Sequence, residues 1–162
     1  MSGHAKLYTG IVVSGLAALV VAGCATAPPA KVGSGDVVAD RQRLMKLNGA
    51  SWADVQAKAK AGNIEGIAVN AETMAINAMH IASLFPSGSL TEKSKAKPEI
   101  WQKWAEFEAA AKNFQAQAEK LRDTARTKDA AATQAILRDF GRQTCGACHT
   151  PFRVPPPSPP RS

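Results

Sequence analysis

Apolar residues recur at three- and four-residue spacing through most of the chain, which predicts helices. A first helix is predicted to begin near Asp36 and to end at Gly62-Asn63. A second is predicted from about Ile64 to Phe85, where Pro86 and Gly88 end it. The apolar stripe of this second helix is rich in alanine and consists of Ile64, Ile67, Ala68, Ala71, Met74, Ala75, Ala78, Ile81, Ala82 and Phe85.

Two further helices are predicted after a loop of basic and polar residues. Pro98 suits the first turn of a third helix, where its missing N–H costs nothing, and Asp129 suits the cap of a fourth. The predicted core of these two helices consists of Ile100, Trp101, Trp104, Phe107, Ala111, Phe114, Leu121, Ala132, Ile136, Leu137 and Phe140. With no alternating strand pattern, the fold class predicted for residues 36–153 is all-α, an antiparallel up-and-down four-helix bundle.

The N-terminal segment has the pattern of an export signal, predicted over residues 1–23. An apolar run follows Lys6 and ends in small residues, and "VAGC" resembles the lipobox of bacterial lipoproteins. We therefore expect Cys24 to be acylated and to anchor the protein to a lipid membrane on the periplasmic side; the alternatives are an uncleaved anchor or a soluble periplasmic protein. Residues 24–35 are predicted to form a flexible tether, and residues 154–162 a proline-rich disordered tail.

Composition and charge narrow the function. The chain of 162 residues has a formal net charge of +7, which by itself is compatible with nucleic-acid binding. An exported chain without interleaved arginine and aromatic residues makes that unexpected, so no nucleic-acid partner is predicted. Aromatic residues are only 6% of the chain. An alanine-rich core fills little volume, so a large apolar cofactor inside the bundle would supply the missing bulk.

The segment Cys145-Gly-Ala-Cys148-His149 indicates which cofactor this is. Two cysteines three residues apart share one face of a helix, from which both thiols can bond the vinyl groups of a haem, and the next histidine can ligate its iron. A structural zinc site would need four ligands, typically with a second Cys or His pair, and a thioredoxin-like redox pair would need a neighbouring strand. The sequence therefore predicts one covalently attached haem c; the alternative is a haem-free helical lipoprotein with a disulfide or a metal site.

The position of this motif in the last helix resembles the cytochrome c′ family, the class II c-type cytochromes. Gly141 and Arg153, which flank the motif, and the segments "RQRLMKLNG" and "AKPEIWQKWAEFEAAAK" are also similar to that family, over about residues 38–153. The resemblance implies a monohaem cytochrome in the periplasm that is not an enzyme and exchanges electrons with redox partner proteins of the periplasm or membrane. Because family members are often dimers, it also implies a homodimer as a candidate assembly.

The resemblance further implies that the residue at Met45 decides the function. In one branch of the family a methionine at this position ligates the iron, and the match to "RLMKLNG" predicts low-spin iron with His149 and Met45 as axial ligands, suited to carrying one electron. The alternative is five-coordinate, high-spin iron that binds nitric oxide or carbon monoxide. Arg41 matches an arginine near the haem propionates, and the alternative for it is a solvated charge. Weaker candidates for the distal ligand are Met74, Met79 and His80.

Overall fold

The computed structural model describes residues 34–157, and the predicted signal peptide and Cys24 lie outside them. Six α-helices and two short helical turns make up the described part. They are α1 (Val37–Lys60), α2 (Ile67–Met79), the 3₁₀ turn η1 (Ala82–Leu84), α3 (Glu99–Gln102), α4 (Trp104–Arg126), α5 (Ala130–Gly141), the π-helical turn η2 (Arg142–Gly146) and α6 (Ala147–Phe152). Extended backbone pairs at one place in this range, the antiparallel bridge between Ala96 and Arg153.

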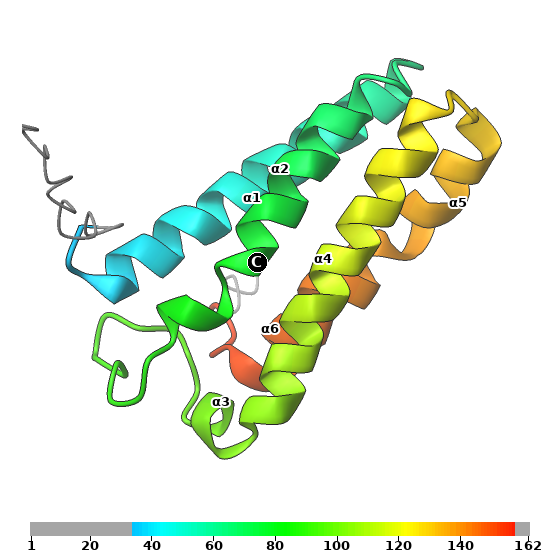
Figure 1. Ribbon diagram of the computed structural model, residues 1–162. Coiled ribbons are helices and arrows are strands. Elements are labelled where there is room, and N and C mark those ends of the chain that lie inside the picture. The colour runs from blue at the N-terminus through cyan, green and yellow to red at the C-terminus, as the bar shows by residue number, and fades with distance from the viewer. Residues whose placement is uncertain (1–33, 158–162) are drawn as a thin grey trace, which may run out of the picture. The chain divides into compact units, whose positions relative to one another are not determined.

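Four long helical stretches form the bundle: α1, α2, α4 and the continuous run α5–η2–α6. Figure 1 shows α1 beside α2, and α4 beside α5 and α6. The short α3 lies at the end of the bundle where α4 begins, close to α6. The prediction of an antiparallel four-helix bundle is confirmed.

The ends of the helices follow local chemistry. Asp36 caps α1 by accepting hydrogen bonds from the backbone N–H groups of Val38 and Ala39, at 2.9 and 3.1 Å. Asp129 caps α5 in the same way, accepting from the N–H of Ala132 at 2.9 Å. Gly62 follows α1 with a φ of 73°, a left-handed conformation that favours glycine.

The core is centred on the contact between α2 and α4, where small side chains face one another. Ala71 on α2 and Ala118 and Ala125 on α4 are fully buried. Side chains this small let the two helices pack closely, while Ile67 and Leu121, also fully buried, fill the space between the alanines. The stripe predicted for the second helix is buried except at Ala82, which is half-buried.

The predicted third helix is interrupted, and one predicted core residue is wrong. Lys103 has φ −120° and ψ 46°, which are not helical and separate α3 from α4. This break changes the register of the helix, so Trp104 is 37% exposed, whereas Phe107 is buried. Trp104 covers Phe107 from the outside, with their ring centroids 5.6 Å apart.

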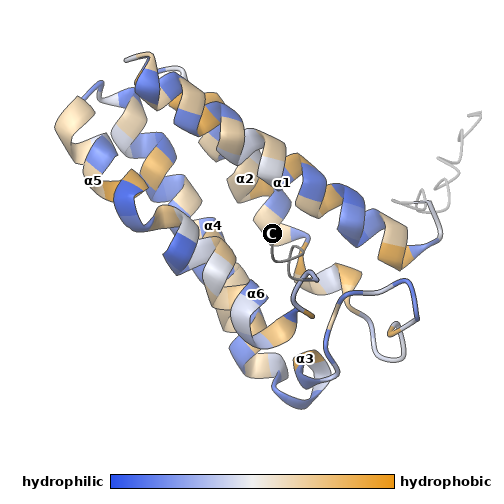
Figure 2. Ribbon diagram, turned by 180° about the vertical axis from the view of Figure 1, so that it is seen from behind, coloured by the Kyte–Doolittle hydropathy of each residue, from blue (hydrophilic) through white to orange (hydrophobic). Residues whose placement is uncertain are grey.

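Hydrophilic and hydrophobic residues are interspersed along each of the long helices, as Figure 2 shows. None of the helices described between residues 34 and 157 combines the length and the apolar character that crossing a membrane requires.

The close contact of α2 with α4 predicts a clear effect of overpacking. Ala118→Leu is expected to lower the free energy of unfolding of the holoprotein by about 1–3 kcal/mol, because the added atoms have no space at a fully buried position. The matched control is Ala116→Leu, at an exposed position of the same helix, with an expected change within about 0.5 kcal/mol. Urea unfolding followed by circular dichroism measures both, and equal stability of the two variants would contradict this packing.

Candidate functional site

A cavity of about 490 Å³ opens between α1, α4 and the end of the C-terminal helical run. Its walls are mainly apolar, and every charged residue that lines it is basic. Its lining includes side chains that are charged, polar, aromatic or contain sulfur: Arg41, Met45, Lys46, Asn48, Trp52, Met74, Lys95, Cys145, Cys148, His149 and Arg153. The sequence-predicted residues Cys145, Cys148, His149, Met45 and Arg41 therefore all meet at one cavity.

Both cysteines line the cavity from a region where the helix changes its pitch. Cys145 lies in the π-helical turn η2 and Cys148 in α6, so the two thiols are not on a regular α-helix as the spacing argument assumed. The Thr144 hydroxyl contributes to this turn by donating to the carbonyl of Phe140 at 2.6 Å. Neither cysteine forms a disulfide in the described structure, and burial together with the nearby Cys145 raises the pKa of the Cys148 thiol to about 11.

His149 lies next to Cys148 on the same wall. The surrounding protein desolvates the imidazole, which lowers its pKa, and the positive charge of Arg153 lowers it further. Both effects favour the neutral ring, the form whose nitrogen lone pair can bind a metal. Residues 34–157 contain no cluster of three or more His, Cys, Asp or Glu side chains that could hold a metal ion by themselves.

Arg41 is a buried cation, not a solvated one. Its side chain is 5% exposed; Nη2 donates to the Ser89 carbonyl and hydroxyl at 3.1 and 2.8 Å, and the guanidinium lies 4.3 Å from the centre of the Phe85 ring. Nε donates to the Val37 carbonyl at 3.3 Å, and the third nitrogen, Nη1, is buried without a hydrogen-bond partner in the described structure. A buried donor of this kind needs an acceptor, and a carboxylate group entering the cavity would satisfy it.

Met45 reaches the cavity from α1, half-buried, and Met74 reaches it from α2, fully buried. The other weaker candidates for an iron ligand are not placed there. Met79 is 63% exposed and His80 is also exposed, and neither lines the cavity.

Sequence reasoning missed Asn48, which lines the cavity one turn after Met45. Its Oδ1 accepts from Nδ2 of Asn77 at 2.9 Å, which joins α1 to α2. Its own Nδ2 is buried and has no partner among the described residues. A polar residue at a helical core position is the signal that could have singled it out.

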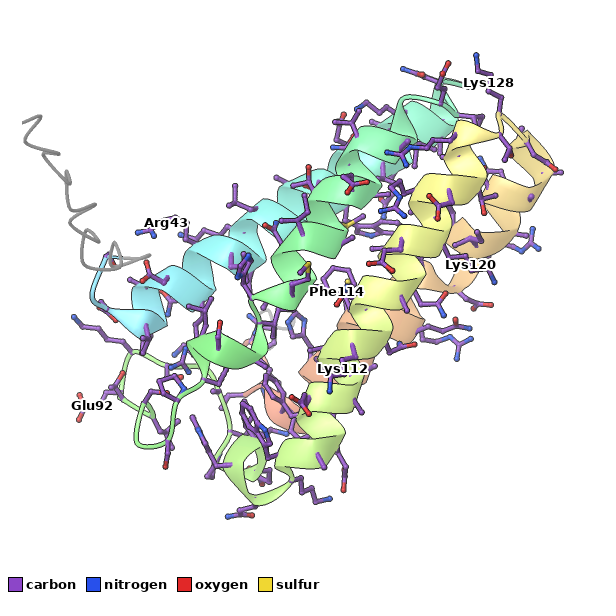
Figure 3. The ribbon with its side chains drawn as sticks, viewed as in Figure 1. Arg43, Glu92, Lys112, Phe114, Lys120 and Lys128 are labelled. Carbon is purple, nitrogen blue, oxygen red and sulfur yellow. The ribbon has the colours of Figure 1, made fainter. Side chains whose placement is uncertain are left out.

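Two aromatic side chains that line the cavity, Trp52 and Phe114, pack against the buried ring of Phe140. Trp52 stacks on Phe140 with a centroid distance of 5.0 Å, and Phe114 meets Phe140 edge-on at 6.3 Å. Figure 3 shows Phe114 on the inner side of α4, facing the other helices. Trp52 and Phe114 also line the cavity, so a flat aromatic ligand would meet rigid apolar walls.

Known proteins with a similar sequence or fold were found for this chain. The model of the cytochrome c′ family matches residues 36–153. Cytochrome c-556 of Agrobacterium tumefaciens is 31% identical over 120 residues, which are 72% of this chain and 96% of that protein.

The solved structures that are similar to this chain include a cytochrome c′ and complexes of cytochrome c prime variants with small gases. A cytochrome c′ described by its ligand-controlled dimer dissociation has a TM-score of 0.69 and 23% identity, over 78% of this chain and all of that one. A nitric oxide complex of a variant of cytochrome c prime from Alcaligenes xylosoxidans has a TM-score of 0.67 and 26% identity, and a carbon monoxide complex of another variant has 0.66 and 26%. Each of these two covers 75% of this chain and 96% of its own.

The burial of Arg41 predicts that even a charge-conserving replacement is costly. Arg41→Lys is expected to lower the free energy of unfolding by about 1–3 kcal/mol, because one ammonium group cannot keep both bonds to Ser89 and the contact with Phe85. Arg43→Lys is the matched control, since Arg43 points outward from α1 in Figure 3 and pairs only with Asp40. Denaturant unfolding of both variants tests this, and a neutral Arg41→Lys would show that the buried contacts are unimportant.

Proposed function

Because the chain belongs to the cytochrome c′ family, and is therefore a monohaem c-type cytochrome with one covalently bound haem c, we propose that the haem lies in the cavity described above. Cys145 and Cys148 would bind it, each S–H adding across a vinyl group to give a thioether, and His149 would be the proximal ligand of the iron. This assignment is supported by two free thiols and an imidazole on one wall of a mainly apolar cavity. When bound, the haem supplies an iron that can change its oxidation state or take up a small ligand.

The remaining walls fit the edge and the faces of a porphyrin. The unpaired Nη1 of Arg41 is a donor for a propionate group, which would balance a buried charge. Trp52 and Phe114, which line the cavity, would contact the ring through their apolar surfaces. These residues would hold and orient the haem and exclude water from it.

For the function of the iron, we propose reversible binding of nitric oxide or carbon monoxide on the side of Met45. The comparisons favour it, because the similar solved structures include nitric oxide and carbon monoxide complexes. The chain's own contribution is a distal wall that contains Met45 and the unpaired amide nitrogen of Asn48. Met45 would limit the space open to a ligand, and the Asn48 amide would be a donor for a polar one.

The second candidate is the one that the sequence puts first, a low-spin electron carrier with His149 and Met45 as axial ligands. One observation favours it: Met45 carries a thioether into the same cavity as His149. A thioether is a soft ligand that stabilises reduced iron, which suits electron transfer. The two candidates differ only in whether Met45 bonds the iron or stands beside it.

Optical spectra of the purified holoprotein separate the two functions. We expect high-spin spectra, binding of carbon monoxide by the ferrous protein, and faster binding in Met45→Ala. A tenfold increase in rate would correspond to a barrier lower by about 1.4 kcal/mol, caused by removal of a blocking side chain. Low-spin ferric spectra with a sulfur-to-iron band that disappears in Met45→Ala would establish the electron carrier instead.

Two controls accompany this test. Met79→Ala removes an exposed methionine outside the cavity and should change neither spectrum nor rate. In the double variant Cys145→Ser/Cys148→Ser, haem should no longer migrate with the protein in denaturing electrophoresis. Retention of haem by that variant would show that the attachment is elsewhere.

We also propose that the protein is exported to the periplasm and anchored through an acylated Cys24, and that it forms a homodimer. A similar cytochrome c′ is described as a dimer, and four exposed apolar side chains, Leu47, Val69, Ile76 and Met79, lie on α1 and α2. Mass spectrometry of the mature N-terminal peptide tests whether Cys24 is acylated. Analytical sedimentation of the protein without its first 33 residues tests whether the domain forms a dimer. An unmodified Cys24, or a monomer at high concentration, would contradict the corresponding proposal.

A further inference from the structure

Five cations that form no ion pair within residues 34–157 belong to the lining of the cavity or lie next to it in the chain. Lys46, Lys95 and Arg153 line it, and Lys93 and Lys97 flank Lys95 in the chain. None of the five takes part in the salt bridges found among residues 34–157, although those bridges involve eight other lysines and arginines. We refer to these five residues as the basic rim.

Backbone contacts bring the basic rim together from three segments. Gln42 on α1 donates to the carbonyl of Lys93 at 3.0 Å, so Lys46, one turn further along the same face, lies on the side of α1 that meets this loop. The loop then pairs with the end of α6 through the bridge between Ala96 and Arg153. Two backbone hydrogen bonds hold that pairing. The N–H of Lys97 donates to the carbonyl of Phe152 at 2.9 Å, and the N–H of Val154 donates to the carbonyl of Lys95 at 2.8 Å.

Acidic side chains do little to neutralise the rim. No Asp or Glu is among the residues that line the cavity. The nearby Asp40 already pairs with Arg43 at 2.7 Å. Glu92 is the one acid between residues 90 and 98, and it projects outward from the loop in Figure 3.

Elsewhere on the bundle many charges are paired, and the other exposed cations outside the salt bridges of residues 34–157, Lys60, Lys120 and Arg138, come from three different helices. Glu72 on α2 accepts from Arg122 and Arg126 on α4, at 3.1 and 3.4 Å, and Asp123 also pairs with both arginines. Unpaired cations are therefore grouped at the cavity, whose lining contains no acidic residue. An electrostatic potential of one sign at a cleft raises the rate at which oppositely charged partners associate there.

We propose that the basic rim is the docking surface for the carboxylate-rich face of a partner protein, which exchanges single electrons with the haem. The inference rests on the haem lying in this cavity but not on whether Met45 bonds its iron. A partner seated on the rim would stand over the mouth of the cavity, beside the edge of the haem. Opposite charges across such an interface steer the encounter and fix its orientation more than they add affinity.

A matched pair of charge-reversal variants of the holoprotein tests this. The rim variant Lys46→Glu/Lys95→Glu is compared with Lys120→Glu/Arg138→Glu, which makes the same change in net charge at exposed positions of α4 and α5 that do not line the cavity. Figure 3 shows Lys120 on α4. Optical spectra and unfolding midpoints first verify that both variants retain the haem and the fold, and Lys46→Gln/Lys95→Gln replaces the rim variant if it does not fold.

The first readout is binding of a short poly-L-glutamate peptide, a surrogate for an acidic protein face, measured at low ionic strength by calorimetry and by NMR shifts. We expect the rim variant to bind about tenfold more weakly or worse, the control variant to change less than about threefold, and the shifts in wild type to cluster at the rim. Equal losses in both variants, or shifts spread over the surface, would overturn the proposal, because net charge alone would then explain the binding.

The second readout is the rate at which small oxidants take one electron from the ferrous haem. Ferricyanide, which is anionic and becomes ferrocyanide, is expected to react more slowly with the rim variant by about tenfold, whereas cationic tris(phenanthroline)cobalt(III), which becomes the cobalt(II) complex, should react faster. Added salt should reduce both differences. Rates that change equally in the rim and control variants would overturn the proposal, whichever spectrum Met45 gives.

Discussion

The turn that carries Cys145 determines where everything else in the site must lie. A regular helix would continue from α5 into α6, but the π-helical turn η2 changes the direction in which the following side chains point. The bond from the Thr144 hydroxyl to the Phe140 carbonyl is buried, and Thr144 is 1% exposed, so the inner side of this turn is held in the core. Cys145, Cys148 and His149 are thereby presented to one cavity, and α1, α2, α4 and the loop around Lys95 supply its other walls.

Local patterns in the sequence were enough to predict most of the fold. The caps at Asp36 and Asp129 and the alanine stripe of α2 depend on residues close together in the chain, so spacing and side-chain chemistry predict them. The break at Lys103 could not be predicted this way, because lysine is a good helix former and the break depends on how α3 packs at the end of the bundle. The exposure of Trp104 follows from that break and was missed for the same reason.

The part of the site that lies within one motif could be predicted from the sequence. The motif "CGACH" is enough to indicate the cofactor, but the part of the cavity formed by Arg41 and Asn48 depends on contacts between distant segments. Arg41 is held by Ser89, which is 48 residues away, and Asn48 by Asn77, which is 29 residues away. The same limit applies to the basic rim, because Gln42, the loop after Lys93 and Arg153 meet only through tertiary contacts.

These distant contacts also constrain Met45. Arg41 and Asn48 lie one turn before and one turn after it on α1, and each is bonded to a different element of the fold. The backbone of α1 between them therefore has little freedom to approach the haem or to withdraw from it. The methionine side chain, in contrast, has three rotatable bonds and fills irregular space easily. Whether the thioether bonds the iron or only restricts access to it can thus be decided by side-chain rotation alone, within a helix held in place at both ends of the site.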